Sequence, residues 1–171
     1  ASPLAMEAYE REAHRLHLYP DGGAKELRAA IGQRFGLAPA RIVCGAGSDE
    51  IISLLIRAYA GVGDEVLYSA HGFLMYQINA KSAGATPVAA PETNLTANVD
   101  ALLDAVTHRT KMLFLANPNN PTGSYLPANE LRRLRKGLPD HVLMVIDAAY
   151  AEYVSRNDYV SGAELVEKHD N

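Results

Sequence analysis

The stretch EVLYSAHGFLMYQINAKSAGATPVAA, residues 65–90, contains the pattern that decides the fold. Residues 65–69 predict a strand, residues 73–83 predict a helix that ends at Gly84, and residues 86–90 predict a second strand. A helix between two strands provides the long crossover that parallel pairing requires. We therefore expect the two strands to lie parallel in one sheet.

The same alternation of strands and helices recurs on both sides of this stretch. Further strands are predicted at residues 41–44, 111–116 and 142–146, and helices at residues 49–60, 98–106 and 127–136. Alternating elements indicate an α/β fold in which a mostly parallel sheet carries helices on both faces. We expect about seven strands in that sheet.

Two helices are expected before the first strand. Ser2 and Pro3 form a good N-cap and first turn for a helix at residues 4–16, and a second helix at residues 24–35 ends at Gly36. Residues 161–171 predict a polar helix that no strand follows. No repeat, low-complexity tract or long linker divides the chain, so residues 1–171 are expected to form one incomplete domain.

Composition and charge exclude several classes of protein. Hydrophobic residues make up 48% of the chain and charged residues 21%, which is typical of a folded protein rather than a disordered one. The net charge of -4 comes without a basic stripe, so neither nucleic acid nor an anionic membrane is an expected partner. No apolar run is long enough for a membrane span, and the start lacks the pattern of a signal peptide. We expect a cytoplasmic protein that acts on small molecules.

The cysteine and histidine content does not suggest a metal site. Cys44 is the single cysteine, so it cannot form an internal disulfide, and we interpret it as a small buried residue. The histidines share no ligand spacing, and His71 is interpreted as a surface or supporting residue. We therefore expect no bound metal.

Polar segments follow three of the predicted strands. Gly45-Ala-Gly-Ser-Asp-Glu50 follows the first strand, Asn117-Pro-Asn-Asn-Pro-Thr-Gly123 follows the strand at residues 111–116, and Asp147-Ala-Ala-Tyr150 follows the last. In open α/β sheets, ligands bind outside the carboxyl ends of the strands. These three segments are therefore the candidate binding site.

Each segment has a chemical and a purely structural interpretation. The glycine turn and the helix after it can hold a phosphate, or Ser48 or Asp49 can simply cap the helix. The rigid loop can present the amide of Asn120 to an oxyanion, or it can be a turn selected for its geometry. Asp147 places a carboxylate at the end of a buried strand, or it can cap the chain that follows. The first segment lacks the third glycine of a dinucleotide fingerprint and the Gly-Lys-Ser/Thr of a P-loop, which disfavours nucleotide binding.

Together the segments resemble the fold-type-I aminotransferases, which depend on pyridoxal 5'-phosphate. The resemblance rests on Asn117-Pro-Asn-Asn-Pro-Thr-Gly123 followed by an apolar strand that ends in Asp147-x-Ala-Tyr150. Tyr19-Pro-Asp-Gly22 and Gly45-x-Gly-Ser-Asp-Glu50 are similar to the corresponding motifs of the histidinol-phosphate aminotransferases and their aromatic relatives. The resemblance covers nearly the whole chain. It implies the large cofactor-binding domain of that family, with residues 1–20 as an N-terminal helix and arm remnant, and without the small C-terminal domain.

The resemblance implies four contacts to the cofactor ring. Asp147 would pair with the protonated pyridine nitrogen and keep the ring an effective electron sink. Asn120 and Tyr150 would hydrogen-bond to the phenolic oxygen. Phe73 would stack on the ring, unless it is an ordinary core aromatic.

The resemblance also implies contacts to the phosphate. Backbone amides around Gly47, Ser48 and Asp49 would hold it at the start of a helix. Tyr19 would reach the phosphate of the cofactor in the neighbouring subunit, which implies a homodimer with shared sites.

The implied activity is transamination of histidinol phosphate with 2-oxoglutarate in histidine biosynthesis. In the family, a lysine in a Ser-x-Lys context forms the Schiff base with the cofactor and moves the proton. No lysine of this chain has that setting, and Lys168 resembles a polar helix end; the lysines are Lys25, Lys81, Lys111, Lys136 and Lys168. We therefore expect a fragment that is inactive by itself, with the family's lysine beyond Asn171. The alternatives are an aminotransferase for aromatic amino acids, a phosphate-substrate lyase that uses the same cofactor, and a non-catalytic domain that kept the fold.

Overall fold

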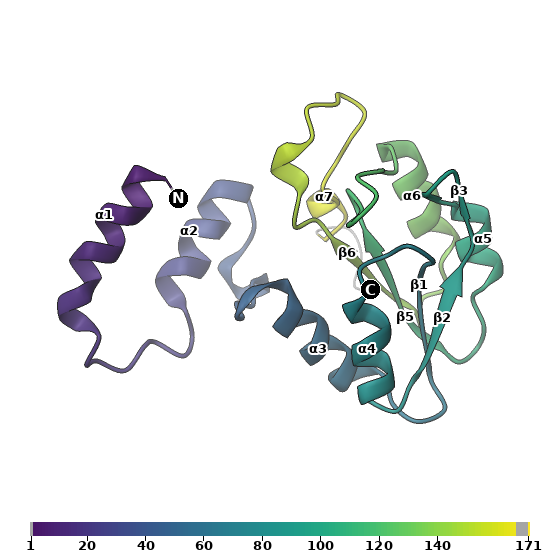
Figure 1. Ribbon diagram of the computed structural model, residues 1–171, viewed down its shortest axis with the longest axis horizontal. Coiled ribbons are helices and arrows are strands. Elements are labelled where there is room, and N and C mark those ends of the chain that lie inside the picture. The colour runs from purple at the N-terminus through teal and green to yellow at the C-terminus, as the bar shows by residue number, and fades with distance from the viewer. Residues whose placement is uncertain (1, 167–170) are drawn as a thin grey trace. The chain divides into compact units, whose positions relative to one another are not determined.

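The computed structural model of the chain describes residues 2–166 and residue 171 (Figure 1). It forms two compact units, Ala1–Cys44 and Gly45–Asn171. Residues 167–170, and with them Lys168 and most of the end of the last predicted helix, lie outside the described residues.

The second unit is built on a parallel sheet, which confirms the α/β prediction. The strands are β1 (Glu65–Ser69), β2 (Thr86–Ala90), β5 (Thr110–Ala116) and β6 (Leu143–Asp147), in the spatial order β2-β1-β5-β6. All three pairings are parallel, as expected for strands joined by helical crossovers. β1 and β5 occupy the centre, where β1 and all of β5 except Lys111 are buried, as is typical of strands covered on both faces.

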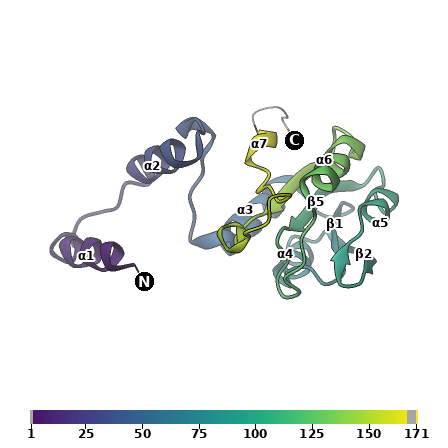
Figure 2. The same ribbon diagram turned by 90° about the horizontal axis from the view of Figure 1, so that it is seen from above.

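Helices cover both faces of the sheet, as predicted (Figures 1 and 2). α5 (Val99–Asp104) and α6 (Ala128–Gly137) contribute buried residues to one apolar core, while α3 (Gly47–Tyr59) and α4 (Met75–Ser82) contribute to the other. Side chains of β5 alternate between the two, because successive residues of a strand point to opposite faces. Leu113 and Leu115 belong to the first core, and Met112, Phe114 and Ala116 to the second.

A short antiparallel hairpin follows β2. It consists of β3 (Glu92–Thr93) and β4 (Thr96–Ala97), and its turn residues Asn94 and Leu95 have positive φ angles of 50° and 58°. The hairpin places Glu92 beside the end of β1, where its carboxylate accepts a hydrogen bond from the backbone amide of His71.

The number of strands differs from the prediction. The described part of the sheet has four strands rather than about seven, and the predicted strand at residues 41–44 does not form. Ile42 has extended backbone angles, but a strand also needs a neighbour that shares its backbone hydrogen bonds. Residues 42–45 belong to no strand. The predicted strand at residues 142–146 forms as β6 but is only half-buried, because it lies at the edge of the described sheet.

Several helix boundaries also shift by one or two residues, and the first helix ends at Glu12 rather than at residue 16. α3 begins at Gly47 rather than at residue 49, and α4 begins at Met75 rather than at Phe73. Pro127 is the N-cap of α6 instead of its first helical residue. The last predicted helix is described as α7 (Ala163–Val166).

The first unit contains α1 (Pro3–Glu12), the 3-10 turn η1 (Ala13–Arg15), α2 (Lys25–Phe35) and the turn η2 (Pro39–Arg41). Ser2 is the N-cap of α1 by position, but its side chain makes no capping hydrogen bond. Gly36 ends α2 in the left-handed conformation, with φ 69°, as the sequence predicts. Asp21 accepts hydrogen bonds from the amides of Lys25 and Gly23, and these bonds lower the pKa of its carboxyl group.

Candidate active site

The candidate site lies at the carboxyl edge of the sheet. Because β1, β5 and β6 are parallel, the loops that follow them emerge on the same side. The amide of Asn117, directly after β5, donates a 2.9 Å hydrogen bond to the carbonyl of Asp147 at the end of β6. This bond brings the asparagine loop next to the predicted carboxylate.

Asp147 is held on both of its carboxylate oxygens. Oδ2 accepts a hydrogen bond from the hydroxyl of Tyr76 at 2.8 Å, and Oδ1 accepts one from the amide of Ala149 at 3.2 Å. The bond from Ala149 is of the kind expected if Asp147 only caps the following chain. The bond from Tyr76 is not, because Tyr76 lies in α4, 71 positions earlier in the sequence. No motif in the sequence marks Tyr76 as a site residue.

One cavity brings most of the predicted ring contacts together. Ser48, Phe73, Asn120, Asp147 and Tyr150 all line a hollow of about 60 Å³, together with Ala116, Pro118 and Ala149. Four separate segments of the chain supply these side chains, and that convergence is what the sequence predicts. Two wider hollows share lining residues with this cavity, so the three adjoin one another.

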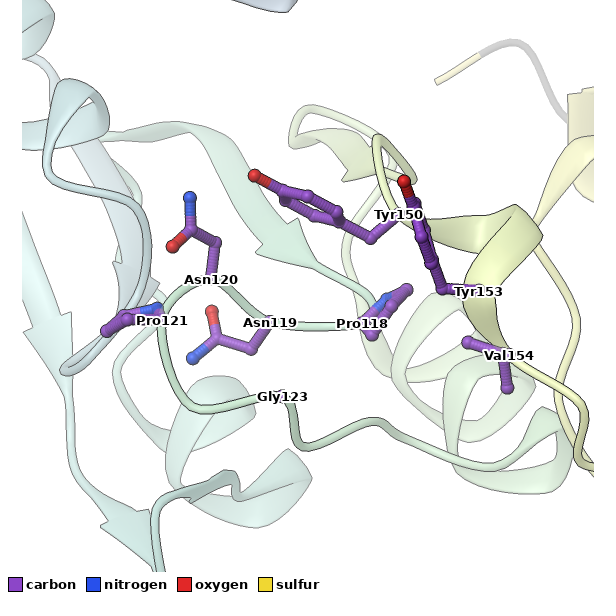
Figure 3. Close-up of a pocket in the computed structure, with 8 residues that line it drawn as sticks. All are labelled: Pro118, Asn119, Asn120, Pro121, Gly123, Tyr150, Tyr153 and Val154. Carbon is purple, nitrogen blue, oxygen red and sulfur yellow. The ribbon is translucent and has the colours of Figure 1, made fainter. Parts of the chain in front are cut away.

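The first wider hollow, of about 330 Å³, lies along the start of α3. Gly45, Gly47, Ser48 and Asp147 are among the residues that line it. The second, of about 400 Å³, lies over the asparagine loop and is closed on one side by Tyr150 and Tyr153 (Figure 3). Asp49 is not among the residues lining these three hollows. Tyr19 belongs to the other unit, where its side chain is fully exposed.

The beginning of α3 has the geometry of an anion site. Gly47 has a φ angle of 78°, which glycine adopts without strain, and the first turn leaves amides without acceptors inside the helix. Ser48 and Asp49 lie in that turn. Neither caps the helix: the N-cap is Ala46, and its amide donates to the carboxylate of Glu50 at 2.6 Å. The structural interpretation of Ser48 and Asp49 as caps is therefore wrong.

The asparagine loop divides its side chains between structure and site. Asn117 is buried, and its amide group bonds to both backbone groups of Leu126, which fixes the base of the loop. Asn119 donates to the carbonyl of His71 and to the hydroxyl of Thr122. These two asparagines fit the interpretation of a turn selected for geometry.

Asn120 is different from its neighbours in the loop. Figure 3 shows its amide and the hydroxyl of Tyr150 turned toward one another at the mouth of the hollow. Within residues 2–166 and 171, no hydrogen bond occupies either of these polar groups. Both are therefore available to a ligand that presents an oxygen atom between them.

Phe73 lies just before α4 and is half-buried. Its ring packs edge-on against Tyr76, with centroids 5.9 Å apart and an interplanar angle of 83°. It contacts the second core and also lines the central cavity. The core interpretation and the ligand interpretation of Phe73 are thus compatible.

A buried carboxylate supports the loop that carries Phe73. Glu92 accepts hydrogen bonds from the hydroxyl of Ser69, from the amide of His71 at 3.0 Å and from Nδ1 of His71 at 2.9 Å. Burial raises the pKa of this carboxyl group, but the hydrogen bonds from Ser69 and His71 outweigh burial and hold it below its usual value. His71 is thus a supporting residue, as predicted, and Glu92 is a residue that sequence analysis missed.

The described residues form neither a membrane span nor a metal site. Among the residues that the structure describes, no helix combines the length and the apolar character that crossing a membrane requires. The described histidines, cysteine and acidic residues form no group of three or more that could hold a metal ion.

Comparison with known proteins identifies the family. The sequence profile of the family described as "Aminotransferase class I and II" matches residues 2–171. The chain belongs to the class I and II aminotransferases. The geometry at the carboxyl edge of the sheet is therefore that of an aminotransferase chain.

Curated relatives of this aminotransferase chain share most of its residues. It is 71% identical over 170 residues to the histidinol-phosphate aminotransferase of Paramagnetospirillum magneticum, a match that covers 99% of the chain and 47% of that protein. It is 64% identical over 170 residues to the histidinol-phosphate aminotransferase of Rhodospirillum centenum, with the same coverage. The chain thus spans about half the length of the curated relatives that it matches.

A solved aminotransferase has the same fold. The crystal structure of histidinol-phosphate aminotransferase from Sinorhizobium meliloti, in complex with pyridoxal-5'-phosphate, superposes with a TM-score of 0.88 at 28% identity. The match covers 92% of this chain and 43% of that one.

Proposed function

We propose that the longer protein of which this chain is a part transfers the amino group of histidinol phosphate to 2-oxoglutarate, using pyridoxal 5'-phosphate, in histidine biosynthesis. The observation that carries the proposal is the convergence of Asp147, Asn120, Tyr150, Phe73 and Ser48 on one cavity. The names of the curated relatives support the choice of histidinol phosphate.

The residues around the cavity fit pyridoxal 5'-phosphate group by group. A protonated pyridine nitrogen needs an acidic partner, and Asp147 is the carboxylate that lines the central cavity. A phenolic oxygen needs hydrogen-bond donors, and the unoccupied amide of Asn120 and phenol of Tyr150 converge at the mouth of the adjoining hollow. The flat ring needs an apolar face, which Phe73 can supply. When bound, the cofactor supplies an electron sink for the bond changes at the substrate.

The phosphate would lie at the start of α3. Amides in the first turn of a helix attract anions, because they lack intrahelical acceptors and stand at the positive end of the helix dipole. Gly47 and Ser48 line the hollow beside that turn, and Asp49 follows them. The carboxylate of Glu50 bonds to the amide of Ala46, the N-cap residue of α3.

The chain's own residues would bind and orient the cofactor rather than move protons. Among the described residues, no lysine lines any of the three hollows. We propose that the part of the longer protein outside this chain supplies the catalytic lysine and a small C-terminal domain. Residues 1–171 would then be its cofactor-binding large domain, with residues 1–20 as an arm.

We also propose that the longer protein is a cytoplasmic homodimer. Gly32 is the only buried residue among residues 2–44, so the first unit has no core of its own. It exposes many large apolar side chains that a second copy could cover; they are Leu4, Met6, Tyr9, Leu16, Leu18, Tyr19, Leu27, Phe35 and Val43. In that dimer, Tyr19 would reach the phosphate of the cofactor in the other subunit.

The test is an assay of the purified longer protein with histidinol phosphate and, separately, with phenylalanine, each with 2-oxoglutarate as acceptor. We expect glutamate formation with a far higher kcat/KM for histidinol phosphate. A preference for phenylalanine would replace the substrate assignment by an aromatic one. No turnover with either donor, from a protein that binds the cofactor, would contradict the proposal and favour a non-catalytic domain.

A further inference from the structure

The hydroxyl of Tyr76 makes a direct contact with the carboxylate proposed to face the cofactor. It donates to Oδ2 of Asp147 at 2.8 Å, although the two residues are 71 positions apart in the sequence. Tyr76 lies in α4 and Asp147 at the end of β6, so the bond joins a helix to the edge of the sheet. Among the described residues, Tyr76 is the only one whose side chain hydrogen-bonds to that carboxylate.

The ring of Tyr76 is fixed by other aromatic rings. It is fully buried, stacks on Phe114 with centroids 4.8 Å apart at 20°, and meets Tyr68 edge-on at 6.4 Å. It also packs against Phe73, the residue expected to stack on the cofactor ring. A side chain held this closely has one position for its hydroxyl, because a packed core leaves little freedom for another rotamer.

The hydroxyl is a permanent donor in this setting. Burial raises the pKa of the Tyr76 phenol, and the charge of Asp147 and the hydrogen bond to it raise that pKa further. The phenol therefore stays protonated throughout the pH range in which such a protein works.

We propose that Tyr76 is a positioning residue, which fixes the orientation of the Asp147 carboxylate toward the pyridine nitrogen of the cofactor. The inference rests on the proposed function, since it needs that nitrogen as the partner of Asp147. Each carboxylate oxygen can accept more than one hydrogen bond, so the bonds from Tyr76 and Ala149 hold the group without using up its capacity. Through its contact with Phe73, the same residue also supports the ring-facing aromatic side chain.

The experiment compares the affinity of the longer apoprotein for two ligands. One is pyridoxal 5'-phosphate, and the other is its carbocyclic analogue, in which a C–H group replaces the ring nitrogen. The ratio of the two dissociation constants isolates the contact between Asp147 and that nitrogen. The variants are Tyr76→Phe, which removes one hydroxyl and keeps the ring, and the matched control Tyr68→Phe. The control does the same to a buried neighbour that, within residues 2–166 and 171, donates to no carboxylate.

We expect the wild-type protein to prefer pyridoxal 5'-phosphate, and Tyr76→Phe to reduce that preference about tenfold, the effect typical of losing one hydrogen bond to a charged group. Tyr68→Phe should keep the wild-type ratio. In an Asp147→Asn background, Tyr76→Phe should change the ratio no further, because the carboxylate it positions is gone.

Other results separate the failure of this inference from the failure of the proposed function. If Tyr76→Phe weakens both ligands equally, or only lowers the melting temperature, Tyr76 is a packing residue and the inference is wrong. A further change of the ratio by Tyr76→Phe in the Asp147→Asn background would overturn it as well. If the wild-type protein does not distinguish the two ligands, the role of Asp147 itself is wrong.

Discussion

At the scale of single residues, the proposed chemistry depends on the carboxylate of Asp147. The backbone carbonyl of Asp147 accepts a hydrogen bond from the amide of Asn117, at the start of the asparagine loop. Both of its side-chain oxygens also accept hydrogen bonds. A carboxylate held in this way does not need to reorient when it meets a cationic partner, and such preorganisation is a large source of catalytic effect.

Replacing this residue by its neutral isostere tests the role directly. In the longer protein, we expect Asp147→Asn to lower kcat on the order of 100-fold or more, even when the cofactor is saturating. The amide keeps the shape but cannot hold a proton on the pyridine nitrogen. Steady-state kinetics at several cofactor concentrations would measure this, with Asp158→Asn, an exposed aspartate bonded to Tyr125, as the control. An unchanged kcat at saturating cofactor would contradict the role.

At the scale of secondary-structure elements, the start of α3 is the feature that the proposal needs most. Gly47 adopts a left-handed conformation there, with a φ angle of 78°, while the space beside its Cα is open. A substitution therefore acts through the backbone and not through a clash.

We expect Gly47→Ala to destabilise the fold by about 1–2 kcal/mol, because an alanine in this conformation is strained. If the strain is relieved by turning the amides of the first turn, affinity for the cofactor phosphate should fall as well. Gly61→Ala is the matched control, since its Cβ would also meet open space and its φ angle lies outside the left-handed range. Calorimetry and cofactor titration measure both effects; equal stability and affinity in both variants would contradict the account.

The opposite edge of the sheet contains a buried acid that stabilises β1. Glu65 accepts hydrogen bonds from the hydroxyl of Thr107, from Arg109 and from Thr110. The bond from Thr107 contributes most to lowering the pKa of this carboxyl group, while burial opposes it. A pKa that is lower in the folded state means that the charged form stabilises the fold at neutral pH. That contribution is lost as the pH falls below the usual range of a glutamate, about 4.

We expect Glu65→Gln to lower the unfolding free energy of the longer protein at pH 7 by about 1–2 kcal/mol. The difference from wild type should shrink as the pH falls through the lowered pKa of the folded-state carboxyl, which lies below the usual range of a glutamate. Denaturant unfolding at pH 7 and at a pH below about 4 measures this. Glu130→Gln serves as the control, because Glu130 pairs with Arg133 and is more exposed than Glu65. A constant difference at both pH values would show that the charge of Glu65 is not the cause.

Most elements could be predicted because their signals are local. β1 and β5 have mostly apolar centres, and Gly36 and Gly84 end helices in the left-handed conformation that glycine tolerates. The predicted strand at residues 41–44 failed because its apolar pattern does not show whether a neighbouring strand exists. The sequence also does not show that β6 is only half-buried. That state follows from its position at the edge of the sheet, which depends on the order of the strands.

The site could be predicted in part for a related reason. Asp147 ends β6, and Asn120 and Tyr150 lie within four residues of a strand end, so the rule that ligands bind at the carboxyl edge was enough to find them. Tyr76 and Glu92 were missed because their roles come from contacts with partners that are distant in the sequence. Tyr76 bonds to Asp147, 71 positions away, and Glu92 bonds to Ser69, 23 positions away. No pattern of nearby residues encodes such a contact.

At the scale of the whole molecule, the proposal predicts that two subunits share each site. If Tyr19 serves the cofactor of the partner, both Tyr19→Phe and Asp147→Asn should impair every site of their own homodimers. In a mixed dimer, one site contains both changes and the other contains neither. We therefore expect co-expression of the two variants to restore part of the activity, measured by glutamate formation. Activity no higher than that of the two single variants would contradict a shared site.

We propose that residues 1–171 hold the cofactor while the lysine that binds it covalently lies elsewhere in the longer protein. Reduction of that protein with borohydride, followed by peptide mapping, distinguishes this division from a site contained in the 171 residues. We expect one labelled lysine outside these 171 residues, and no specific labelled lysine when the 171-residue chain is treated alone. A label on Lys168, or no label in the longer protein, would contradict the account.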